Sequence, residues 1–114
     1  MDFKTSLAER GYAIIPNVLT DVEVSDVKRE FYEWQEATGA IPSFHGIINQ
    51  YNVGGARHAW KVRINPKVQG VFAEIWDTTI DNLVVSLDGT NWIPKDCKSK
   101  DSVWTHTDQA PIMK

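Results

Sequence analysis

The feature that most constrains this fold is a helix signal that begins at Thr20. Thr20 and Glu23 have the spacing of a capping box, in which each side chain satisfies a free backbone N–H group of the other residue. Apolar residues then recur at steps of three and four positions, at Val24, Val27, Phe31 and Trp34. Gly39 ends the pattern after Thr38. We therefore predict an amphipathic helix over residues 20–38 that packs one face against a core.

A second helix signal follows at Asn65 and Pro66. Asn65 suits the N-cap and Pro66 suits the first helical position, where the missing N–H group costs nothing. The apolar residues of this stretch are Val68, Val71, Phe72, Ile75 and Trp76. Their spacing predicts a second amphipathic packing helix that ends at Trp76.

Several short stretches alternate between apolar and polar residues, as strands do. We predict a short edge strand over residues 11–17, which ends at Pro16 and Asn17, and a strand over 59–64. A further strand is predicted over 82–88, ended by Gly89, and strand-like pieces occur within 41–52.

The predicted strand over 59–64 has a cationic face. Trp60, Val62 and Ile64 share one side, whereas Lys61 and Arg63 project from the other. Such a face is usually only solvated. If it lines a cleft, it could hold a dicarboxylate, because guanidinium binds carboxylate in a bidentate manner.

Metal-binding side chains occur at a meaningful spacing in residues 103–109. In an extended strand, His106 and Asp108 lie on one face with their backbones roughly 6 to 7 Å apart, so both can reach one ion. The bland alternative is an ordinary surface histidine and aspartate. His45 and His58 have no partner at ligand spacing, so we expect surface or packed histidines there.

Composition narrows the class of protein. A length of 114 residues predicts a single domain over 1–114, and 42% hydrophobic with 24% charged residues indicates neither disorder nor a membrane span. The net charge of -3 disfavours nucleic-acid binding. Because the first residues lack the apolar core of a signal peptide, we expect a cytoplasmic protein without membrane partners.

The order of these features resembles the amino-terminal half of a phytanoyl-CoA dioxygenase-like protein, one of the Fe(II)/2-oxoglutarate-dependent oxygenases. The resemblance implies an α+β fold, an incomplete double-stranded β-helix (jelly roll) with two packing helices. It also implies hydroxylation of a small or lipid-like substrate. His106 and Asp108 would be iron ligands, and Arg63, or else Lys61, would help to hold 2-oxoglutarate.

The chain departs from the family pattern in lacking any histidine after His106. We therefore expect the third iron ligand to come from a second chain or from a missing carboxyl-terminal half, and the chain to be inactive alone. The alternative is a noncatalytic interaction or structural module that retains half of the fold and pairs through exposed strand edges. A small cupin-like metal enzyme ranks last, because His106 lacks additional ligands nearby.

Overall fold

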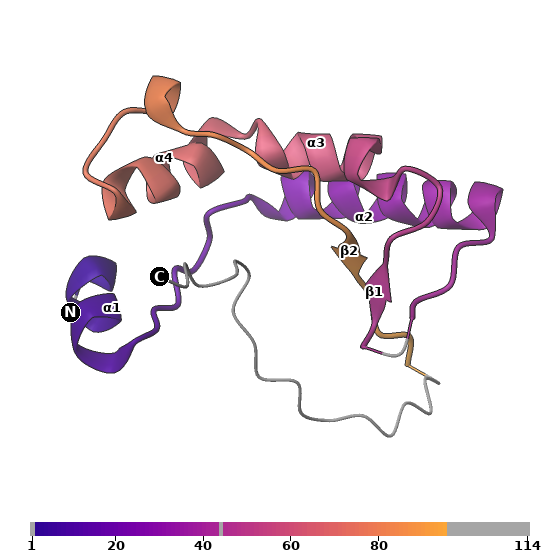
Figure 1. Ribbon diagram of the computed structural model, residues 1–114, viewed down its shortest axis with the longest axis horizontal. Coiled ribbons are helices and arrows are strands. Elements are labelled where there is room, and N and C mark those ends of the chain that lie inside the picture. Colours follow the sequence, from indigo (N-terminus) through magenta and orange to yellow (C-terminus); the bar gives the residue numbers. More distant parts are fainter. Residues whose placement is uncertain (1, 44, 96–114) are drawn as a thin grey trace, which may run out of the picture.

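The computed structural model describes residues 2–43 and 45–95, and helices predominate in it (Figure 1). Four α-helices follow one another: α1 (Phe3–Arg10), α2 (Asp21–Thr38), α3 (Arg57–Arg63) and α4 (Pro66–Ile75). Two short 3-10 helices are η1 (Val53–Gly55) and η2 (Ile80–Asn82). Strands β1 (Ile47–Ile48) and β2 (Thr90–Asn91) pair antiparallel, with Ile47 opposite Asn91 and Ile48 opposite Thr90.

The predicted jelly roll is wrong. Over the residues that the structure describes, the sheet consists of β1 and β2 alone, and most of the ordered backbone is helical. A jelly roll needs many long strands in two sheets, whereas here each strand contributes two residues. None of the helices in this part of the chain combines the length and apolar character needed to cross a lipid bilayer.

Both predicted helices are confirmed. At the start of α2, Thr20 Oγ1 accepts from the backbone N of Glu23 at 3.1 Å, and Glu23 Oε1 accepts from the backbone N of Thr20 at 2.9 Å. Gly39 ends α2 in the left-handed region, at a φ of 68°. Asn65 Oδ1 caps α4 by accepting from the backbone N of Lys67, and Pro66 occupies the first turn. Local side-chain chemistry therefore sets these boundaries.

The predicted strand over 59–64 is instead α3. In a helix, His58 and Lys61 lie three residues apart on one face, and this face packs against α2. His58 contacts the Phe31 ring, with the ring centroids 5.2 Å apart, and Lys61 reaches the acidic side chains of α2. A stretch of only six residues is compatible with both the two-residue period of a strand and the 3.6-residue period of a helix. The contacts with α2 favour the helix.

The strands predicted over 11–17 and 82–88 are also wrong. The first stretch is a bend and turn that follows α1, a helix that we did not predict; Ser6 Oγ donates to the carbonyl of Tyr12. Residues 83–89 follow η2 and run on to β2 (Figure 1) without forming a ladder within the described structure. A β-strand needs a second strand to which its backbone is hydrogen-bonded, and alternation of apolar and polar residues does not show that such a strand is present.

The core lies between α2 and the β1–β2 pair. Its buried members are Phe31, Ala40, Ile48 and Val53, and Trp34 and Trp92 pack against them. Phe31 stands at the centre: its ring meets that of Trp92 edge-on, with centroids 5.3 Å apart. This small core fixes α2 and β2, and through His58 it also fixes α3, which carries the candidate site.

Candidate functional site

Lys61, one of the two cations predicted to hold 2-oxoglutarate, is bound to α2. Its Nζ lies 2.5 Å from Asp26 Oδ2 and 3.0 Å from Glu30 Oε1. Hydrogen bonding to Lys61 holds the pKa values of both carboxyls below their ordinary range, and the same contacts raise the pKa of Lys61. The Lys61 ammonium therefore fastens α3 to α2 and does not present a free charge.

Arg63 lies on a different face of α3 and has different partners. One terminal guanidinium nitrogen donates to the carbonyl of Gly54 at 2.9 Å, and the guanidinium carbon lies 4.6 Å from the centroid of the Trp60 ring. In the described part of the chain, no carboxylate forms an ion pair with Arg63. Its remaining N–H groups are thus available to an anion.

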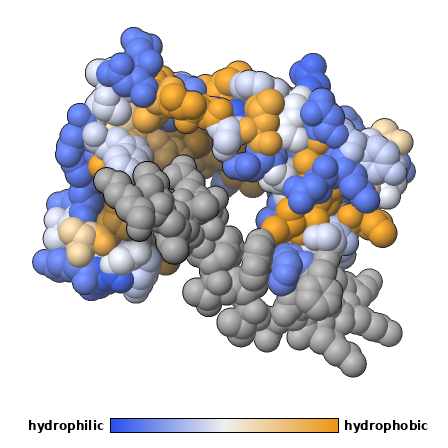
Figure 2. Space-filling view, viewed as in Figure 1, coloured by the Kyte–Doolittle hydropathy of each residue, from blue (hydrophilic) through white to orange (hydrophobic). Residues whose placement is uncertain are grey.

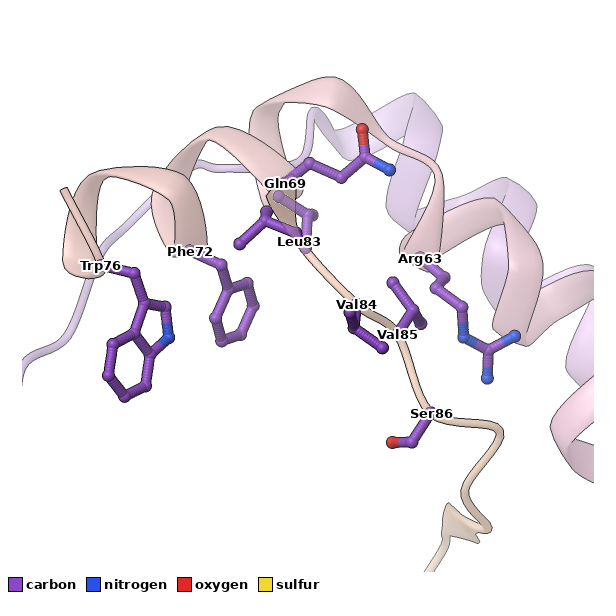
Figure 3. A pocket seen from close by; sticks show the side chains of 9 residues that line it. Arg63, Gln69, Phe72, Trp76, Leu83, Val84, Val85 and Ser86 are labelled. Atoms are coloured by element: carbon purple, nitrogen blue, oxygen red, sulfur yellow. The ribbon is translucent and has the colours of Figure 1, made fainter. Parts of the chain in front are cut away.

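Arg63 lines a hollow of about 290 Å³ between α4 and residues 83–86. Figure 3 shows Arg63 and Trp76 at opposite ends of this hollow, with Phe72 beside Trp76 and Val84 and Val85 between. The other residues that line it are Val68, Gln69, Leu83 and Ser86. The hollow is therefore an apolar groove with one cation at one end.

Glu23 positions the helix that forms one wall of this groove. Its carboxylate accepts from Nζ of Lys67 and, at 2.6 Å, from Nδ2 of Asn65. The hydrogen bond from Lys67, joined by the one from the Thr20 backbone, lowers the pKa of Glu23 to about 2. One carboxylate thus caps α2 and also holds the first turn of α4.

His58 is packed in the core, as predicted. It is 5% exposed, its Nε2 lies 3.0 Å from Thr90 Oγ1, and its Nδ1 has no hydrogen-bond partner among the described residues. Burial lowers the pKa of His58, and the charge of Glu30 opposes this shift. Its ring contacts the rings of Phe31 and Trp34, so His58 is a packed, structural residue.

The predicted iron ligands, His106 and Asp108, lie outside the described residues. Within residues 2–43 and 45–95, no cluster of three histidine, cysteine, aspartate or glutamate side chains could hold a metal ion. The structure therefore separates the two cations predicted for 2-oxoglutarate and leaves the predicted metal pair untested.

The groove itself was not predicted from the sequence. The strand assignment placed Lys61 and Arg63 on one face, whereas the helix separates them. A signal for the groove was present in Phe72 and Trp76, which share a face of α4 four residues apart. They are 52% and 72% exposed, respectively, which identifies an apolar surface beside Arg63.

A comparison with known proteins gives a partial likeness. The chain is 34% identical over 73 residues to Ava biosynthesis cluster protein O of Aspergillus versicolor. The match covers 63% of this chain and 23% of that protein, so the matched region is about a quarter of the relative's length. No protein-family model matches the chain, and no solved structure matches it.

Proposed function

We propose that this chain supplies the co-substrate-binding part of an Fe(II)/2-oxoglutarate-dependent dioxygenase that hydroxylates a small or lipid-like substrate. The observation that carries the proposal is the half-buried Arg63 guanidinium, which lines a groove and has no carboxylate partner among the described residues. The order of sequence features that resembles phytanoyl-CoA dioxygenase-like proteins adds support.

Arg63 suits a carboxylate ligand, and Lys61 does not. A guanidinium offers parallel N–H groups to the two oxygens of a carboxylate. Val84 and Val85 line the groove between Arg63 and Phe72. Lys61 would first have to leave Asp26 and Glu30. We therefore assign the co-substrate carboxylate to Arg63 alone.

His106 and Asp108 remain the proposed iron ligands on sequence grounds. When bound, the iron and 2-oxoglutarate together would supply oxidative hydroxylation of a C–H bond. Two protein ligands hold iron more weakly than three, so we propose that this chain alone is inactive. A second chain or a further segment would have to supply the third ligand.

The relative in Aspergillus versicolor is named as a biosynthesis cluster protein. A role in biosynthesis agrees with the proposed hydroxylation reaction. The match spans only 23% of that protein, so this role is a proposal for the present chain.

Calorimetric titration of the oxygen-free, Fe(II)-loaded chain with 2-oxoglutarate tests the proposal. Arg63→Gln should weaken binding about tenfold, because a bidentate charge-assisted contact is lost. Arg57→Gln is the matched control: it removes the same charge from the same helix, and among the described residues Arg57 forms an ion pair with Glu30 alone, at 3.5 Å. Equal affinity for wild type and Arg63→Gln would exclude Arg63 as the anchor. Succinate formation that His106→Ala abolishes would show that the chain alone is active.

A second candidate function is a noncatalytic interaction module. It is favoured by the apolar side chains that residues 83–89 expose, including Val84 at 96% and Leu87 at 60%. Together with Phe72 and Trp76 they form an apolar surface, and surfaces of this kind include those that bind another polypeptide. Retained partner binding together with an absence of any 2-oxoglutarate binding would favour this function over the first.

A further inference from the structure

The extended stretch 84–88 carries backbone groups that are able to join a β-ladder, although the carbonyls of Leu87 and Asp88 already lie close to Gly54. Within the described structure their N–H and C=O groups make no backbone hydrogen bond, although β2 continues directly from them and pairs with β1. The sequence from Leu83 to Leu87 is rich in β-favouring residues. Such an edge is a template for another strand.

Apolar surface surrounds this edge. Val84 is 96% exposed, and Phe72 of α4 and Trp76, which follows this helix, lie across the groove from it. Figure 2 shows hydrophobic residues gathered along the part of the surface where α4 and residues 83–87 run. A strand added here would bury apolar side chains as well as satisfy backbone groups.

Two unpaired charges flank the same edge. Arg63 has no carboxylate partner, and Asp88 accepts only from Ser86 Oγ, at 2.6 Å, among the residues described. They do not pair with each other. The edge thus carries one cation and one anion, each without an ion-pair partner in the described structure, and this is the pattern of a self-complementary surface.

We propose that residues 83–89 pair antiparallel with the same residues of a second copy of this chain. In a two-fold arrangement centred on Ser86, Val85 lies opposite Leu87 of the second copy, so apolar faces coincide. Asp88 of the second copy lies opposite Val84, which lines the same groove as Arg63. The symmetry forms two equivalent contacts between Arg63 and Asp88.

The charges within the segment permit this pairing. Residues 82–87 contain no ionisable side chain, so two copies can approach without like charges in direct opposition. The inference does not depend on the proposed co-substrate. Both co-substrate binding and dimer formation would use the Arg63 guanidinium. Dimer formation is therefore measured without 2-oxoglutarate, so that the failure of one proposal is not mistaken for the failure of the other.

Sedimentation velocity over a range of concentrations, with charge-swapped variants, tests the inference. The wild type should form dimers, and Arg63→Glu or Asp88→Arg alone should raise the dissociation constant about tenfold. An equimolar mixture of the two variants should form heterodimers about as tightly as the wild type, because each contact again joins opposite charges. A general folding defect would not be rescued in this way.

Hydrogen exchange measured by mass spectrometry then locates the interface. Amides of residues 84–88 should exchange more slowly at dimer-forming concentrations than in dilute monomer, because the ladder protects them. A wild-type chain that stays monomeric, dimers that tolerate both charge changes, variants that fail to rescue each other, or amides without added protection would each overturn the proposal.

Discussion

The imidazole of His58 lies 3.0 Å from the hydroxyl of Thr90, and this contact joins α3 to β2 across 32 positions of sequence. The same imidazole meets Phe31 of α2 edge-on. One buried ring therefore connects the two helices to the strand pair. The position of Arg63 on α3 depends on this connection.

Thr90→Val should destabilise the fold by about 1–3 kcal/mol, because it leaves both nitrogens of a buried imidazole without a partner. The change preserves side-chain volume and branching, so packing is little altered. Urea denaturation followed by tryptophan fluorescence measures the loss. Thr79→Val is the matched control: this threonine is exposed, its hydroxyl accepts only a long, solvent-exposed hydrogen bond from Asn82 at 3.3 Å among the described residues, and the change should alter the free energy of unfolding by less than about 0.5 kcal/mol. Equal effects of the two changes would contradict this role of Thr90.

Stability should fall as the pH is lowered below the ordinary histidine pKa of 6.5. Burial lowers the pKa of His58 in the folded state, so on acidification the unfolded chain binds a proton before the folded chain does. The destabilisation should therefore begin near pH 6.5 and continue to lower pH, partly offset by Glu30. Denaturation midpoints from pH 8 to pH 5 measure it, and His58→Gln should flatten the profile. An unchanged profile in this variant would assign the effect to other groups.

Lys61 should control the thermal stability of the chain, whereas Arg63 should control its affinity for 2-oxoglutarate. Lys61→Met should lower the thermal midpoint, because Asp26 and Glu30 lose their shared cation, and should leave 2-oxoglutarate affinity nearly unchanged. Arg63→Gln should weaken 2-oxoglutarate binding and cost little stability. Circular dichroism melts and calorimetry on both variants provide the comparison. Weaker 2-oxoglutarate binding in Lys61→Met, with unchanged binding in Arg63→Gln, would instead favour Lys61 as the residue that binds the co-substrate.

Thr20→Ala should cost about 1 kcal/mol, the usual loss when an N-cap hydroxyl is removed. Glu23 would keep its contacts with Lys67 and Asn65, so α4 should stay in place. Equilibrium denaturation gives the free energy, and Ser25→Ala, an exposed hydroxyl within α2, serves as the control. A loss no greater than that of the control would mean that the capping box contributes nothing in solution.

Sequence patterns predicted the features that depend on neighbouring residues. The structure confirms both predicted helices, which begin at the Thr20–Glu23 capping box and at Asn65–Pro66. These signals succeed because the hydrogen bonds of a helix cap join residues only a few positions apart. The stretch 59–64 failed because its short alternation fits two periods, and Asp26 and Glu30, some thirty residues away, stabilise the helical one.

The candidate site could be predicted only in part. The sequence suggested Arg63, or else Lys61, as the cation for the proposed co-substrate, but the separation of the two side chains follows from the helical turn of α3. Residues 82–88 have the composition of a strand and lack a neighbouring strand within the described structure, so their alternation predicted a ladder that does not form there. Pairing across a sheet is a long-range property that a local pattern does not contain.

The central claim, that Arg63 is the carboxylate anchor, is tested most directly by NMR of the ¹⁵N-labelled arginine side chains. Titration of the chain with 2-oxoglutarate should shift the Nε–Hε resonance of Arg63 in a saturable way and leave that of Arg57 nearly unchanged. Assignment follows from loss of the signal in Arg63→Gln. An Arg63 resonance that does not move, or arginine resonances that all move alike without saturation, would contradict the account.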